Sequence, residues 1–213
     1  MAVDSKASYS HLPLRVRPFA RLGRLYLGLA AYGGSMALML ESHLGNMPWD
    51  VLHQGLARHI GLSIGAVSVI VGAIVLLLWI PLRQRPGIGT VSNVVVIGVA
   101  VDAALWALPT PDPLWSRALF LGAGILLNAA ATGLYVGARL GPGPRDGLMT
   151  GLAARGHSIR VVRTSIEIGV VAVGFALGGT LGVGTVLYAV AIGPLVHITL
   201  PLFNVRTPQP ATT

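Results

Sequence analysis

The chain has 213 residues, of which 54% are hydrophobic and 10% are charged, and its mean hydropathy is +0.74. Soluble domains carry about 25% charged residues, so this composition excludes an ordinary soluble protein and indicates an integral membrane protein. The net charge of +8 does not indicate nucleic-acid binding, because the basic residues form short clusters between apolar runs, and the absence of cysteine excludes disulfides and thiolate metal sites.

Six apolar runs approach the roughly 20 residues that a transmembrane helix needs. We therefore expect an all-α membrane protein with six transmembrane helices. The first run follows several basic residues, as in a signal peptide, but it is longer than a typical h-region and is interpreted as a retained span. The expected spans are Leu22–Leu40, Leu62–Leu82, Ile88–Leu108, Ala118–Ala138, Ile159–Gly179 and Val183–Phe203.

Lys and Arg concentrate in the N-terminal tail, after the second run and around residues 139–163. These three places share one side if all six runs cross, so the positive-inside rule predicts that both termini are cytoplasmic. Arg58 and Arg117 are exceptions. The expected organisation is a cytoplasmic tail over residues 1–18, three helices over 19–110, three helices over 115–204, and a second cytoplasmic tail over 205–213.

A short motif, G-x-x-P-x-D-x-L-x-x-G-L, occurs twice, beginning at Gly45 and at Gly141, which are 96 positions apart. Its proline suits the first position of a helix, and its aspartate falls in the first turn, near the positive end of the helix dipole. A second match, G-x-G-T-V, begins at Gly87 and at Gly182. Each repeat unit contains three spans, so the second unit is expected to be inverted relative to the first, as in many transporters.

The first copy of this motif begins a helix predicted over Pro48–Ile60, whose 13 residues extend about 20 Å and are too short to cross a bilayer. One interpretation is an amphipathic helix that lies flat at the interface. The other is a re-entrant helix in each repeat, with the two N-termini facing each other to form an anion-attracting site. The sequence leaves both open.

Three stretches carry a family resemblance: G-P-G-P-R-D-G-L-M-T-G-L at 141–152, S-I-R-x-x-R-T-x-I-E at 158–167, and G-T-L-G-V-G-T at 179–185. They resemble the YczE-like (YczE/YyaS/YitT) bacterial membrane proteins, most closely over residues 140–203. The resemblance implies a multi-pass protein of the bacterial cytoplasmic membrane. It suggests transport in general terms and supplies no substrate.

Arg145 and Asp146 are the leading candidates for a solute site, with Arg145 contacting an anionic or polar solute and Asp146 orienting it. The alternative is that Arg145 only follows the positive-inside rule and Asp146 only caps a helix. The first motif copy carries Trp49 and Asp50 at these positions. The pair of motifs therefore predicts a site with one aromatic wall and one cationic wall.

Glu167 lies inside the fifth run, where a carboxylate is costly and must face protein or water. Arg163, four positions earlier, is its expected partner. The pair is either a protonatable or solute-binding site or an internal ion pair. Asn128 lines a solute path or bonds a neighbouring helix. Asp102 and His197 are expected to extend toward the membrane surface.

No enzyme motif, cofactor motif or metal-ligand spacing is present. We therefore expect no catalysis, no cofactor and no metal. The expected function is a transporter or channel-like facilitator of an unidentified small solute in the bilayer. The alternative is a non-transporting accessory protein that assists a partner. Four small-residue pairs allow a homodimer, namely Gly61/Gly65, Gly133/Gly137, Gly147/Gly151 and Gly174/Gly178.

Overall fold

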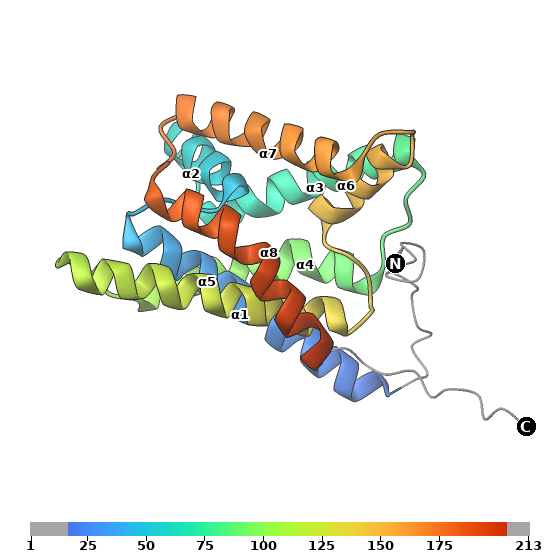
Figure 1. Cartoon of the computed structure of the whole chain (residues 1–213), viewed down its shortest axis with the longest axis horizontal. Coiled ribbons are helices and arrows are strands. Elements are labelled where there is room, and N and C mark those ends of the chain that lie inside the picture. The colour runs from blue at the N-terminus through green and yellow to red at the C-terminus, as the bar shows by residue number, and fades with distance from the viewer. Residues whose placement is uncertain (1–16, 204–213) are drawn as a thin grey trace, which may run out of the picture.

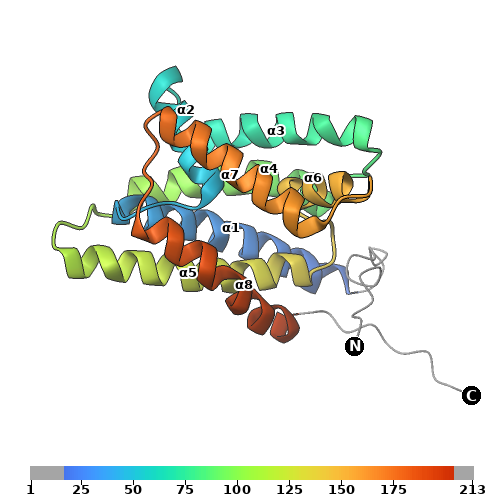
Figure 2. The ribbon, with the colours of Figure 1, turned by 45° about the horizontal axis from the view of Figure 1, so that its top comes forward.

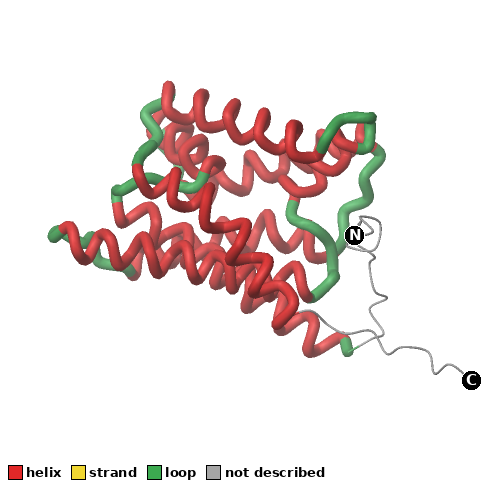
Figure 3. The backbone as a smooth tube through the Cα atoms, in the orientation of Figure 1, coloured by secondary structure: helices red, strands yellow, loops and turns green. Residues whose placement is uncertain are grey.

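The computed structural model describes residues 17–203, and the regular structure in this part of the chain is entirely α-helical (Figures 1 and 3). The expected cytoplasmic tails lie outside these residues, except for Arg17 and Pro18. The helices are α1 Pro18–Ser42, α2 Pro48–Ile60, α3 Ile64–Leu82, α4 Ile88–Ala107, α5 Leu114–Gly137, α6 Pro144–Ala153, α7 Ile159–Ala176 and α8 Val183–Phe203.

The long helices run roughly along the long axis of the molecule, and the two short helices, α2 and α6, lie toward opposite ends of it (Figures 1 and 2). α1 packs along α5 and α4, and α5 also packs along α8. Each short helix contacts a long helix from the other half of the chain: α2 lies against α7, and α6 lies against α3. The two halves of the chain therefore exchange their short helices, each of which packs on the other half.

A long helix covers each of the six apolar runs, which confirms the all-α prediction, but the runs differ in their suitability for lipid. α3, α4, α5 and α8 are long and apolar enough to cross a membrane. α1 and α7 are not among these four helices. α7 carries Arg160, Arg163 and Glu167 within 18 residues, and α1 carries polar and charged side chains as well as apolar ones.

The interior of the bundle is centred on α1. Leu25, Leu29 and Met36 are fully buried there, against apolar side chains of α4 and α5. The exterior is also apolar, since Leu77 on α3 and Val190 on α8 are 62% and 71% exposed. A surface of this kind is unfavourable in water and suits a lipid environment, where helices satisfy their own backbone hydrogen bonds.

Both short helices begin where the repeated motif predicts, with Pro48 and Pro144 in the first turn. Just upstream, Gly45 and Gly141 have φ angles of +124° and +136°, which L residues with a side chain rarely adopt. A Cβ at Gly45 would lie 2.8 Å from the backbone nitrogen of Thr185, and a Cβ at Gly141 would lie 2.6 Å from the hydroxyl of Thr90. Glycine is thus required at both positions for conformation and for space.

Backbone contacts of these connections occur at matching places in the two halves. The N–H of Gly184 donates to the carbonyl of Leu44 at 2.8 Å, and the N–H of Gly89 donates to the carbonyl of Leu140 at 2.9 Å. Each bond joins the start of the last helix of one half to the connection that precedes the short helix of the other half.

Two arginines 96 positions apart also make matching contacts, because each donates to two carbonyls at the end of a long helix. Carbonyl groups at the C-terminal end of a helix have no hydrogen-bond partner within the helix, and they attract cations. The bonds run from Arg21 to Ala138 and Arg139 at 2.9 and 3.1 Å, and from Arg117 to Ser42 and His43 at 2.7 and 3.0 Å.

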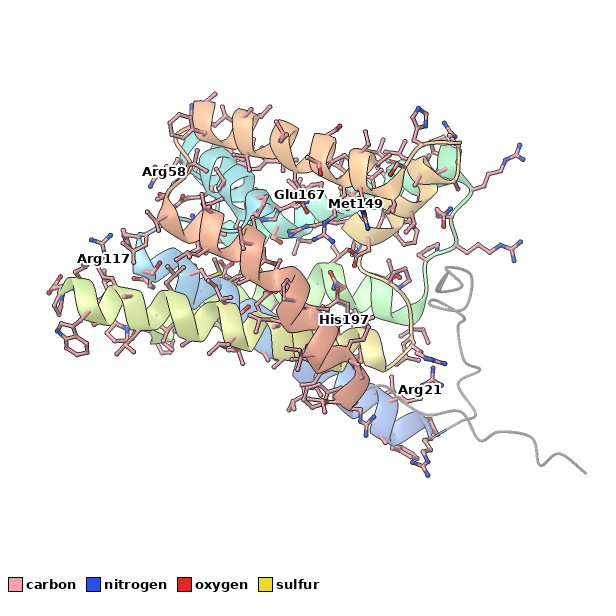
Figure 4. The ribbon with its side chains drawn as sticks, in the orientation of Figure 1. Arg21, Arg58, Arg117, Met149, Glu167 and His197 are labelled. Atoms are coloured by element: carbon pink, nitrogen blue, oxygen red, sulfur yellow. The ribbon has the colours of Figure 1, made fainter. Side chains whose placement is uncertain are left out.

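Arg58 and Arg117, the two exceptions to the charge pattern, lie at the end of the molecule opposite Arg21 (Figure 4). Each is bound to backbone. Arg117 contacts the end of α1, and Arg58 donates to the carbonyl of Gly178, just after α7. Their position therefore has a local structural reason in helix-end recognition.

Each small-residue pair that allows a homodimer has at least one glycine packed closely within the chain. A Cβ at Gly65 would overlap the carbonyl of Gly98, and one at Gly147 would overlap the ring of Trp79, whereas a Cβ at Gly61 would meet nothing within 4 Å. Close approach of helices inside the fold accounts for the packed glycines, and the homodimer stays a prediction.

Candidate functional site

The first turns of α2 carry a buried acid–imidazole pair. Asp50 and His53 are three positions apart and share a helix face, and Nδ1 of His53 lies 3.2 Å from Oδ1 of Asp50. Their side chains are 1% and 0% exposed. Burial lowers the pKa of His53, on a helix too short to cross a bilayer, so the imidazole is neutral at pH 7. We assign its proton to Nδ1, which donates to Asp50.

Arg145, in the first turn of α6, contacts this pair. Its terminal nitrogen Nη2 lies 3.4 Å from Nε2 of His53 and 4.0 Å from Oδ1 of Asp50. Its guanidinium also lies over the ring of Trp49, 5.0 Å from the ring centre, in a cation–π contact. The N-terminal turns of the two short helices thus meet through side chains.

This contact differs from the predicted site with separate aromatic and cationic walls. Trp49 and Arg145 stack on each other and leave no room for a solute between them. The expected anion-attracting character is also reduced. Each short helix carries its own carboxylate, Asp50 or Asp146, in its first turn, and that charge interacts with the positive end of the dipole.

A cavity of about 360 Å³ lies beside this cluster, and its walls include residues from seven helices, all but α2. Arg145, Asp146 and Arg163 supply charged side chains. Its other polar lining residues are Tyr32, Ser68, Asn93, Thr132, Tyr135, Tyr188 and His197.

Asp146 lies at the wall of this cavity, close to the hydroxyl of Tyr135, which donates to Oδ2 at 3.4 Å. Burial raises the pKa of Asp146, and the positive charges of Arg163 and Arg145 oppose that rise. The carboxyl is thus held away from water, with two cations nearby and hydrogen bonds from the Tyr135 hydroxyl and the Gly143 backbone.

Asn128 is fully buried and belongs to a hydrogen-bonded chain beside the cavity. Its amide nitrogen donates to the hydroxyl of Ser35 at 2.9 Å, and its oxygen accepts from the hydroxyl of Tyr188 at 3.1 Å. Asn128 therefore joins α5 to α1 and α8, and its influence on the cavity is exerted through Tyr188, which lines the wall.

Arg163 and Glu167 form the expected ion pair on α7, with Nε of Arg163 2.8 Å from Oε1 of Glu167. Their side chains are 56% and 29% exposed, so Glu167 is not the deeply buried carboxylate that its sequence position suggests. Arg163 lines the cavity, whereas Glu167 stands behind it. Figure 4 labels Glu167 on α7, beside α6.

That Asp102 and His197 extend toward the membrane surface stays a prediction, and the structure shows where each side chain lies. Asp102 accepts hydrogen bonds from Ser63 at 2.5 Å and from the N–H of Gly65 at 2.8 Å, so it caps the start of α3. His197, on α8, lines the cavity (Figure 4).

Sequence reasoning missed His53 and the three tyrosines of the cavity wall, Tyr32, Tyr135 and Tyr188. His53 could have been found from its i,i+3 spacing to Asp50. The tyrosines come from three helices far apart in the sequence, and no local pattern indicates that they meet. Tyr32 and Tyr135 lie edge to face, with ring centres 6.0 Å apart.

A helical bundle whose exterior suits lipid defines the general class, a multi-pass membrane protein, and this one has a cavity with charged and polar side chains in its wall. The chain belongs to the family of unknown function DUF6198, whose model matches residues 19–201. It is 41% identical over 199 residues to an uncharacterised Haemophilus influenzae protein, covering 93% of this chain and 91% of the relative.

Two Bacillus subtilis proteins are also similar. One is described as an uncharacterised membrane protein, YczE, 33% identical over 179 residues, with 83% of each chain covered. The other, YyaS, is 26% identical over 183 residues, covering 83% of this chain and 90% of YyaS. These matches confirm the resemblance to YczE-like membrane proteins. No solved structure matches the chain.

Proposed function

We propose that this protein moves a small solute across the bacterial cytoplasmic membrane, as a transporter or channel-like facilitator. The observation that carries the proposal is the cavity of about 360 Å³, which lies between helices of a largely apolar bundle and has charged side chains in its wall. Charged groups within a lipid-facing bundle are costly and usually line a path for solutes or ions. No group in the proposal performs catalysis.

We further infer that all six long helices span the membrane and that the two halves are inverted repeats. The matching bonds of Gly184 and Gly89, and those of Arg21 and Arg117, support the repeat. Three spans in each half would give the halves opposite orientations, and transporters of this kind bind their solutes between the repeats. The charges of α1 and α7 then face protein or the membrane surface.

We infer that α2 and α6 are re-entrant rather than flat. Their N-terminal residues are buried, whereas their C-terminal ends are not: Pro48 and Pro144 are buried, and Ile60 and Ala154, the residue that caps α6, are exposed. A flat interfacial helix would instead expose one face along its whole length. The contact of Arg145 with Trp49 is the meeting point that two such helices would make.

The basic end of the bundle supports a cytoplasmic location for both termini. Arg21 and Arg24 begin α1, and Arg83, Arg139 and Arg155 follow helices that end on the same side (Figure 1). Positive-inside topology would place this end in the cytoplasm.

The proposal is tested with purified protein in liposomes and a panel of labelled amino acids, organic acids, amines and ions. The expected result is uptake that depends on the protein and is lost in Arg145→Gln, while Arg85→Gln, at an exposed position outside the cavity, retains it. Absence of uptake for the whole panel, with a stoichiometric partner co-purifying from native membranes, would support the accessory role instead.

A further inference from the structure

Asp146 is the charged residue of the cavity wall that takes part in no ion pair. Of the three ion pairs among the described residues, one joins Arg145 to Asp50 and another joins Arg163 to Glu167. The third joins His53 to Asp50, so none includes Asp146. The cavity therefore combines two cations that have carboxylate partners outside it with one carboxylate that has no ion-pair partner and is hydrogen-bonded by the hydroxyl of Tyr135 and the backbone of Gly143.

Arg163 retains donors for a ligand despite its ion pair. Its Nε binds Glu167, and within the described part of the chain its two terminal amino groups have no hydrogen-bond acceptor. A guanidinium offers five N–H donors along more than one edge, so it can bind a second carboxylate while keeping the first. Its 56% exposed side chain, at the cavity wall, leaves that edge accessible.

Asp146 and Arg163 both line the cavity, and their charges interact. The charge of Arg163 is the main factor that opposes the rise in the pKa of Asp146, yet the two side chains do not form an ion pair. The two side chains are therefore close enough for their charges to interact but do not neutralise each other in an ion pair. Both remain available to bind a ligand.

The remaining walls suit a small polar molecule. Tyr32 and Tyr188 present aromatic rings, and Asn93 and Thr132 present hydrogen-bonding groups. A volume of about 360 Å³ is at the lower end of the range for small-molecule sites. The space therefore favours a ligand of few atoms that carries charges of both signs.

We propose that the cavity binds a zwitterionic amino acid, with its ammonium group on Asp146 and Tyr135 and its carboxylate on Arg163. This inference rests on the proposed transport function and names the class of solute. Arg145 is a positioning residue in this scheme, since its contacts to Trp49, His53 and Asp50 hold the first turn of α6, and with it Asp146, in place.

The test uses three probes of similar size on the purified full chain: L-alanine as the zwitterion, ethylamine as the amine alone, and propionate as the carboxylate alone. Thermal unfolding in detergent is measured at equal probe concentrations, and amino acids with larger side chains follow. Native protein should be stabilised by one or more amino acids and not by ethylamine or propionate. Asp146→Asn and Arg163→Gln should each weaken that binding at least tenfold, while Asp112→Asn and Arg85→Gln, at exposed positions outside the cavity, should retain it.

Equal stabilisation by ethylamine or by propionate would overturn the proposal, because a single charge would then suffice. The absence of stabilisation by every amino acid would also overturn it. If the liposomes take up another solute in that case, the transport function is supported and only the zwitterion site is wrong. If Asp146→Asn does not fold, the three probes on the native protein decide the matter by themselves.

Discussion

The guanidinium of Arg145 lies 5.0 Å from the centre of the Trp49 ring, so the same position of the repeated motif contacts itself across the two halves. The contact leaves Arg145 between an aromatic face and the buried pair of Asp50 and His53. Arg145 of α6 therefore links the two short helices through its contacts with side chains of α2.

Arg145→Gln should therefore lower the free energy of unfolding by on the order of 3 kcal/mol, because it leaves the Asp50 carboxylate buried beside a neutral side chain. Adding Asp50→Asn to that variant should recover part of the loss, since the uncompensated charge is removed. Thermal unfolding of the four proteins of this double-mutant cycle measures the coupling. Independent, additive effects of the two substitutions would contradict the contact.

Gly147→Ala should destabilise the protein by about 1–3 kcal/mol or more, because the added methyl group overlaps the ring of Trp79. That ring also donates from its Nε1 to the carbonyl of Pro144 at 2.9 Å, so α6 would shift at its first turn. Gly169→Ala is the matched control, since a Cβ there meets nothing within 4 Å, and the melting temperature should be unchanged or higher. Equal behaviour of the two variants would mean that α6 does not pack on Trp79.

Arg21→Gln and Arg117→Gln should lower stability by similar amounts, about 1–3 kcal/mol each, because each removes charge-assisted bonds to two helix-end carbonyls. The two sites lie at opposite ends of the molecule (Figure 4), so their effects should add in the double variant. Melting temperatures of the three variants check this expectation. A neutral effect of either single substitution would show that its bonds contribute nothing.

Glu167→Gln should change stability by less than about 1 kcal/mol, because solvent-exposed i,i+4 pairs contribute little. Solute uptake and its pH dependence should also persist, since Glu167 stands behind Arg163 rather than at the cavity wall. Asp146→Asn, by contrast, should abolish uptake. The comparison is made by measuring initial uptake rates across a pH series. Loss of the pH dependence in Glu167→Gln alone would contradict this expectation and would identify Glu167 as the protonatable group.

Local features of the fold could be predicted from the sequence because they depend on neighbouring residues. Proline and glycine set the starts of α2 and α6, apolar length set the long helices, and i,i+4 spacing gave the Arg163–Glu167 pair. The repeat of Asp50 and Asp146 marked the first turns of the two short helices as equivalent, and Arg145 joins these turns through its contacts with Trp49 and Asp50.

The composition of the cavity could not be predicted in the same way. Tyr32, Tyr135 and Tyr188 meet only because α1, α5 and α8 pack together, and hydrophobic periodicity does not identify the neighbour of a helix face. The same holds for Asp102, because its bonds to Ser63 and Gly65 depend on α4 packing beside the start of α3. The pairing of His53 with Asp50 could have been predicted, because their three-residue spacing is visible in the sequence.

The most direct test of the cavity as a solute path uses the absence of cysteine from the chain. Thr132→Cys places one thiol in the cavity wall, and Asp112→Cys places one in the exposed connection between α4 and α5. Both proteins are treated in liposomes with a membrane-impermeant thiol reagent, and uptake of the transported solute is measured before and after labelling. The expected result is that labelling at position 132 stops uptake while labelling at position 112 leaves it intact. Unchanged uptake after complete labelling at position 132 would contradict a path through this cavity.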